Sequence, residues 1–136
     1  MLTLPFAGRP VLLKFPNNTA AQIGHISPIG PIPDSHDPHW SALWPSSIAL
    51  ADALLSGEIA VAVARVLELG CGLGLGSIAA ALAGAAMVLA TDIEPRALDC
   101  TRANAELNGA GDAIATRILD WRAPESGGPG LPRNTI

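Results

Sequence analysis

The stretch LELGCGLGLG, residues 67–76, decides the fold expected for this chain. A short apolar run and one acid, Glu68, lead into glycines at every second position from 70 to 76. A glycine held in a fixed structure costs conformational entropy, so four of them at this spacing need a physical reason. The spacing indicates a loop whose backbone is approached so closely that no side chain fits.

Strands and helices are expected to alternate around this loop. The apolar, β-branched segments have the composition of buried parallel strands, and helical segments lie between them. In chain order, beginning with a strand, the five predicted elements are 64–69, 76–83, 86–92, 95–108 and 115–121. Gly84 ends the first helix, and Pro95 opens the second at its first helical position. Such short connections indicate right-handed βαβ units, which predicts an α/β fold with a Rossmann-like, doubly wound parallel sheet. One face of the second helix is predicted to carry Ala97, Cys100, Asn104 and Leu107.

The N-terminal part, residues 1–39, is expected to be an irregular or β-hairpin preamble. PVLLKF, residues 10–15, can form an edge strand, whereas four prolines between residues 26 and 38 disfavour a helix or a central strand there. A helix is predicted to follow, with Pro45 at its first position and Gly57 as its stop. Its apolar stripe is predicted to be Leu50, Ala51, Leu54 and Leu55.

Composition limits the classes of function. The chain has 136 residues, is 49% hydrophobic and 15% charged, and carries a net charge of −4 without a Lys/Arg run, so no nucleic-acid partner is expected. Cys71 and Cys100 give no disulfide framework and fit a reducing cytoplasm. His36 and His39 lack a supporting cluster, so no metal site is expected. No signal peptide is evident, and the glycines weaken a membrane-span interpretation of the 23 uncharged residues before Asp92.

The glycine loop and Asp92 together indicate a nucleoside-containing cofactor. Bare amides at a helix N-terminus favour negative or polar groups, and an acid that ends the next strand can accept both hydroxyls of a ribose. Asp92 lies 20 residues after Gly72. The dinucleotide pattern G-x-G-x-x-G fails in both registers, at Leu75 and at Ser77, so an NAD(P)-binding oxidoreductase domain is the less favoured alternative. A purely structural βα turn remains open.

Four sequence blocks in order resemble the class I, seven-β-strand S-adenosylmethionine-dependent methyltransferases, in their protein-lysine methyltransferase-like branch. The blocks are LWPSSIALADALL, VLELGCGLGLGSIAAALAGA, ATDIEPRALDCTRANAELNG and ILDWRAP. The resemblance covers about residues 39–123, so residues 40–123 are expected to be the cofactor-binding half of a methyltransferase domain. It implies S-adenosyl-L-methionine as the cofactor and a protein or small-molecule amine as the methyl acceptor.

The resemblance also implies roles for individual residues. Glu68 would lie near the methionine end of the cofactor, Asp92 would hold the ribose, and Trp44 would close over the methionine moiety. The remaining implied cofactor contacts are backbone at Gly70, Cys71, Gly72 and Gly74, and the adenine contacts of Ile93, Asp120 and Trp121. Other interpretations remain open for some of these residues. Trp44 and Trp121 could be core aromatics, Asp120 could cap a turn, and Cys71 could be a small loop residue. Asn104 and Asn108 are expected to form local hydrogen bonds at the helix end.

The family pattern continues beyond a third strand, and the sequence does not. The tail, residues 124–136, is rich in glycine and proline and is expected to be disordered. The chain is therefore expected to be the N-terminal half of a methyltransferase, truncated after the third core strand. A non-catalytic remnant that binds cofactor is the alternative. The first strand would lack a neighbour, so self-association through that edge is expected.

Overall fold

The computed structural model describes residues 1–16 and 39–123. The proline-containing stretch at 26–38 and the tail at 124–136 lie outside the described residues.

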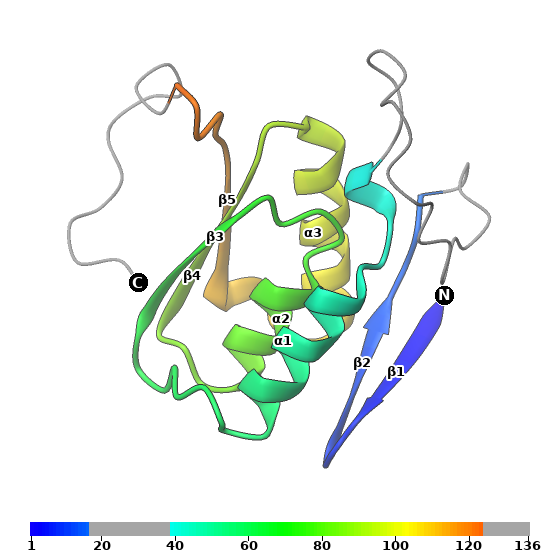
Figure 1. Cartoon of the computed structure of the whole chain (residues 1–136), viewed down its shortest axis with the longest axis vertical. Helices are drawn as coiled ribbons and strands as arrows, with labels where there is room; N and C mark the ends of the chain where they lie inside the picture. Colours follow the sequence, from blue (N-terminus) through cyan, green and yellow to red (C-terminus); the bar gives the residue numbers. More distant parts are fainter. Residues whose placement is uncertain (17–38, 124–136) are drawn as a thin grey trace.

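A three-stranded parallel sheet in the order β3-β4-β5 forms the centre of the described part (Figure 1). Its strands are β3 (Arg65–Leu69), β4 (Met87–Asp92) and β5 (Ile114–Ile118). The helices between them are α2 (Leu75–Leu82) and α3 (Pro95–Leu107). The predicted alternation and the Rossmann-like α/β class are thus confirmed, with bounds within a few residues of those expected.

The three α-helices of the described part lie on the same side of this sheet (Figure 1). Strands added in one direction through right-handed crossovers place both connecting helices on one face. The preceding helix α1 (Pro45–Leu55) packs on α2. Val66, Val88 and Ile114 are neighbours in the sheet register and point into the helical core. A doubly wound sheet carries helices on both faces, and the described residues supply the helices of one face.

The buried faces of the helices differ in part from the predicted stripes. On α3, Leu107 is 40% exposed and Cys100 is only partly buried. The side chains of α3 that are buried are Ala97, Leu98, Thr101, Asn104 and Ala105. On α1, Ala51 and Leu54 are buried as predicted, whereas Leu50 is exposed. Helix α3 has to contact the sheet, the glycine loop and the N-terminal strands, so its buried surface is wider than one stripe.

The N-terminal residues form the hairpin that the sequence allowed. Strands β1 (Leu2–Phe6) and β2 (Arg9–Leu13) pair antiparallel, and Gly8, with a φ of +83°, lies in the turn between them. Val11 and Leu13 are fully buried in the main core. The hairpin therefore packs against the helices rather than extending the parallel sheet.

β3 is an edge strand among the described residues. Its three central residues are half-buried, whereas β4 is buried from Val88 to Asp92.

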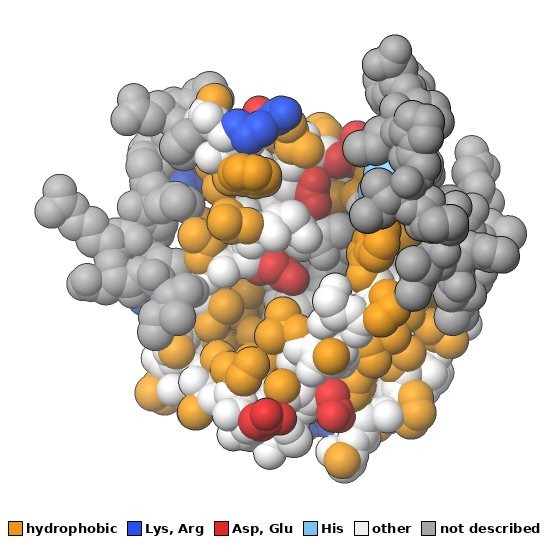
Figure 2. Space-filling model, viewed as in Figure 1, with side chains coloured by type: hydrophobic (Ala, Val, Ile, Leu, Met, Phe, Trp, Pro, Cys, Tyr) orange, Lys and Arg blue, Asp and Glu red, His pale blue; other side chains and the backbone are white. Residues whose placement is uncertain are grey.

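No helix in the described part is long and apolar enough to cross a membrane. The face in Figure 2 carries apolar side chains interrupted by separate acidic ones, and its most prominent basic side chains lie at the top.

Candidate functional site

The glycine loop joins β3 to α2 and turns sharply at the end of the sheet. Gly70, Gly72 and Gly74 have φ values of +72°, +52° and +85°, a region that other residues rarely adopt. The Cys71 N–H donates to the Thr91 carbonyl at 2.9 Å, and the Gly74 N–H donates to the Cys71 carbonyl at 2.7 Å. The loop is thus a closed turn that is held against the end of β4.

The protein's own atoms account for most of the close approaches to these glycines. A Cβ on Gly72 would lie 2.7 Å from the Trp40 carbonyl oxygen, and one on Gly74 would lie 2.9 Å from the Thr101 side chain. A Cβ on Gly76 would collide with the Glu68 carboxylate. Gly70 differs, because no atom of the described residues lies within 4 Å of its Cβ position. Of the four loop glycines, Gly70 alone therefore has open space beside it in the described part of the chain.

Glu68 reaches from β3 to the N-terminus of α2. Its Oε2 accepts hydrogen bonds from the Ser77 N–H, at 2.8 Å, and from the Ser77 hydroxyl. Gly74 at the N-cap offers no side chain, so Glu68 caps the helix from a neighbouring strand. Burial raises the pKa of the Glu68 carboxyl to about 7, despite the bonds from Ser77 that oppose this shift.

Asp92 ends β4 on the other side of the loop. Its Oδ2 accepts from the Gly72 N–H at 3.0 Å, and its Oδ1 accepts from the Glu94 N–H at 3.0 Å. The residue is only 7% exposed. Asp92 therefore fixes the loop directly, and each oxygen retains further capacity to accept a hydrogen bond.

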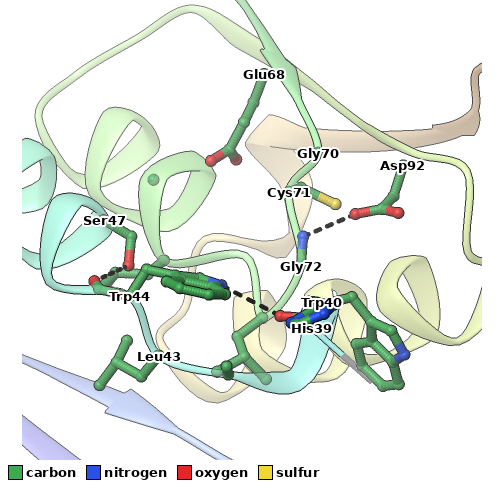
Figure 3. A pocket seen from close by; sticks show the side chains of 14 residues that line it. His39, Trp40, Leu43, Trp44, Ser47, Glu68, Gly70, Cys71, Gly72 and Asp92 are labelled. Carbon is green, nitrogen blue, oxygen red and sulfur yellow. Dashed lines mark hydrogen bonds between the residues drawn. The ribbon is translucent and has the colours of Figure 1, made fainter. Parts of the chain in front are cut away.

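A cavity of about 280 Å³ opens between these acids and the segment before α1 (Figure 3). The loop and the ends of β3 and β4 form one wall, and residues 39–47 form the other. The Trp44 indole N–H donates to the His39 carbonyl at 3.2 Å, and the Ser47 hydroxyl donates to the Trp44 carbonyl at 2.7 Å. The second wall is thus an ordered turn.

Six of the ten residues predicted from the sequence line this cavity together. They are Trp44, Glu68, Gly70, Cys71, Gly72 and Asp92. The lining residues that the sequence reasoning missed are His39, Trp40, Ala42, Leu43, Ser47, Leu73, Leu75 and Gly76. Two tryptophans within HWSALW, just ahead of a helix start, are the sequence signal that could have pointed to the second wall.

The other four predicted residues lie outside the cavity lining. Gly74 is the N-cap of α2 and packs on Thr101. Ile93 and Trp121 follow β4 and β5 and are 55% and 67% exposed. The Leu119 N–H donates to the Asp92 carbonyl at 3.0 Å, which brings the end of β5 next to that of β4.

Asp120 forms an ion pair with Arg122 at 2.9 Å, and the hydrogen bonds from Arg122 lower the pKa of the Asp120 carboxyl. The open interpretation of Asp120 as a turn cap has support, because its Oδ1 also accepts from the Arg122 N–H at 3.0 Å. Trp121 and Trp44, which is 46% exposed, are not core aromatics.

Cys71 is a buried loop residue in this site. The Thr101 hydroxyl donates to its Sγ at 3.3 Å, and burial raises the pKa of the thiol to about 12. The side chain is therefore a neutral thiol, which makes it a poor nucleophile. Among the described residues, no group of His, Cys, Asp and Glu could hold a metal ion; His36 lies outside them.

Comparisons with known proteins indicate the family of this chain. Residues 49–126, more than half of the chain, match the family of ribosomal protein L11 methyltransferase (PrmA). The electron transfer flavoprotein beta subunit lysine methyltransferase of Danio rerio is 49% identical over 72 residues, which are 53% of this chain and 28% of that protein. Its Homo sapiens counterpart is 43% identical over 72 residues, again 53% of this chain and 28% of that protein.

A ribosomal protein L11 methyltransferase from Methylococcus capsulatus is 57% identical over 51 residues, which are 38% of this chain and 17% of that protein. The chain thus spans less than a third of the length of these relatives. The solved structure of SMU.776 in complex with SAH superimposes with a TM-score of 0.53 at 22% identity, over 59% of this chain and 21% of that chain, which supports the fold. On the extent of the family match, the chain belongs to the ribosomal protein L11 methyltransferase (PrmA) family.

Proposed function

We propose that residues 40–123 bind S-adenosyl-L-methionine as the cofactor half of a protein methyltransferase. The observation that carries this proposal is the cavity between Glu68, the free side of Gly70, and Asp92. The matched family and the relatives above are named as methyltransferases, and SMU.776 was solved with SAH.

The charges of the site fit this cofactor better than a dinucleotide. S-adenosylmethionine carries a sulfonium and an ammonium group, and both are attracted by carboxylates. A pyrophosphate placed on the same loop would lie near Glu68, and the ionised fraction of this carboxyl opposes a further negative charge. Asp92 can accept from the ribose of either ligand, so the preference rests on Glu68 and on the departure of the loop from G-x-G-x-x-G.

Each residue has a proposed role in holding the cofactor. Asp92 accepts from the ribose hydroxyls, Glu68 faces the methionine end, and Trp44 covers it. Outside the cavity, the exposed side chains of Ile93 and Trp121 offer apolar surfaces for the adenine. Asp120 accepts from the adenine amino group through Oδ2, which accepts one bond from Arg122 and has capacity for another, whereas Oδ1 already accepts two. Gly74 acts indirectly, through the shape of the loop.

The bound cofactor supplies a methyl group on a sulfonium that is already activated for displacement. The described residues would orient it and exclude water from one side. The proposed acceptor is a protein lysine, following the name of the Danio rerio relative, with a small-molecule amine as the alternative. Cofactor binding without methyl transfer is the competing hypothesis for this chain.

We further propose a cytoplasmic location, which fits the two free cysteines. We also propose self-association through the edge of β3 that is open among the described residues.

Calorimetry with S-adenosylhomocysteine tests the cofactor assignment. Replacing Asp92 with alanine leaves ribose hydroxyls without an acceptor, so the dissociation constant should rise by about 5- to 150-fold, corresponding to roughly 1–3 kcal/mol. Asp52→Ala, an exposed change on α1, is the matched control and should bind as the unmodified chain does. A folded Asp92→Ala variant with unchanged affinity would remove Asp92 from the site.

A further inference from the structure

Asn104 of α3 and Asn108, its C-cap residue, bind the outer edge of β2 and of Lys14, the residue that follows it. The Leu12 N–H donates to Asn108 Oδ1 at 2.8 Å, and Asn108 Nδ2 donates to the Leu12 carbonyl at 2.7 Å. Asn104 makes the same pair of bonds with the Lys14 N–H and carbonyl, at 2.8 and 3.1 Å. The sequence-based expectation that both amides bond locally holds for one bond from Asn108 to the Asn104 carbonyl and one from Asn104 Nδ2 to Cys100 Sγ, but their main partners are distant in the sequence.

The spacing explains why asparagines four residues apart suit this role. β2 pairs with β1 through alternate residues, so the backbone groups of residues 12 and 14 point away from β1. Side chains at i and i+4 of a helix lie on one face, one turn apart. Each side-chain amide offers a donor and an acceptor, as a neighbouring strand would. The two asparagines thus satisfy an edge that would otherwise be open.

Asn104 makes one bond that Asn108 does not. Its second N–H donates to the Leu73 carbonyl of the glycine loop at 2.9 Å, and the residue is fully buried. The Leu73 carbonyl belongs to the peptide whose N–H, on Gly74, closes the turn onto Cys71. A planar peptide has its C=O and N–H fixed relative to each other, so holding the carbonyl also holds the turn.

We infer that Asn104 is a positioning residue for the cofactor loop and that it couples docking of the N-terminal hairpin to the shape of the site. This inference rests on the proposed function, because it concerns the affinity for the proposed cofactor. Leu73 lines the cavity, and Lys14 and Leu73 bond to the same amide group. Release of the hairpin therefore frees Asn104, which loosens the turn that faces the ligand.

A comparison of Asn104→Ala with Asn108→Ala tests the inference. Both variants lose two bonds to β2, and both should unfold at lower urea concentration than the unmodified chain. Only Asn104→Ala should shift the backbone amide NMR signals of residues 71–74 and weaken S-adenosylhomocysteine binding, by about tenfold, since it alone leaves a loop carbonyl unpaired. Asn108→Ala should change the affinity by less than about twofold, because the two bonds between Lys14 and Asn104 still hold the hairpin at the residue that contacts the loop.

A second variant keeps the test decisive if Asn104→Ala does not fold. Lys14→Pro removes the N–H that donates to Asn104 Oδ1 and leaves Asn104 itself in place. It should shift the signals of residues 71–74 in the same direction and weaken binding to a smaller degree. Unchanged loop signals in both Lys14→Pro and Asn104→Ala, or equal loss of affinity in Asn104→Ala and Asn108→Ala, would overturn the inference. If the unmodified chain binds no S-adenosylhomocysteine, the proposed function fails, while the loop signals still test the positioning role.

Discussion

At the scale of single residues, Gly72 is fixed by a contact within the protein. A Cβ there would lie 2.7 Å from the Trp40 carbonyl, and the φ of +52° is itself strained for alanine. Gly72→Ala should therefore lower the free energy of unfolding by at least about 2 kcal/mol. Gly109→Ala is the matched control, because its φ is +68° and nothing lies within 4 Å, so it should cost only about 1 kcal/mol. If urea unfolding showed the same loss of free energy of unfolding in Gly72→Ala and Gly109→Ala, Trp40 would not constrain the loop.

Glu68 should give the chain a recognisable dependence of stability on pH. Burial raises its pKa from 4.5 to about 7, so between these values the folded chain holds a proton that the unfolded chain has released. The free energy of unfolding then falls as pH rises through this window, by no more than about 3 kcal/mol. Glu68→Gln, which cannot ionise, should lack this decrease. Urea unfolding of both proteins at pH 5 and pH 8 measures the difference; parallel profiles would contradict the burial of an ionisable carboxyl.

At the scale of elements, α2 depends on a cap supplied by β3. Ser77 is fully buried and donates both its N–H and its hydroxyl to Glu68. Ser77→Ala should destabilise the chain by about 1–2 kcal/mol, because the carboxylate loses its hydroxyl partner. Ser47→Ala, at the start of α1, loses a bond to the Trp44 carbonyl in a more exposed position and should cost less than about 0.5 kcal/mol. Thermal unfolding of the two variants side by side checks this order, and a reversed order would show that α2 needs no such cap.

The elements that sequence alone predicts well are those with local signals. Prolines at the first helical positions of α1 and α3 and positive-φ glycines after α1, α2 and α3 mark their ends, which is why the alternation around the loop was predicted to within a few residues. The acids Glu68 and Asp92 were predicted because they end strands next to the loop. The binding of β2 by Asn104 and Asn108 was missed, since contacts about 90 residues apart leave no local pattern. The wall formed by residues 39–47 was largely missed for the same reason.

At the scale of the whole molecule, one face of the sheet lacks helices within the described residues. Val66 faces the helical core, so Leu67 and Leu69 lie on the opposite face, where Leu69 is 54% and Met87 is 49% exposed. In the part of the chain that the structure describes, β3 has no strand beyond it, and this edge adjoins the apolar face. An open edge beside apolar side chains favours pairing with another chain.

The 136-residue chain should therefore self-associate in a concentration-dependent manner. Leu67→Lys, at the middle of β3, should shift it towards the monomer, since charged side chains at an edge oppose pairing. Leu50→Lys introduces the same charge at an exposed position on α1 and should have no such effect. Sedimentation equilibrium of the three proteins measures their degree of self-association. A monomeric unmodified chain at high concentration would show that the edge is covered.

One calorimetric comparison tests whether the cavity beside the glycine loop binds S-adenosylmethionine in preference to a dinucleotide. The unmodified chain is titrated with S-adenosylhomocysteine and, in the same buffer, with NAD. Because the loop departs from G-x-G-x-x-G, and because Glu68 attracts the ammonium group of S-adenosylhomocysteine and opposes a pyrophosphate, S-adenosylhomocysteine should bind more tightly. Tighter binding of NAD would contradict the account.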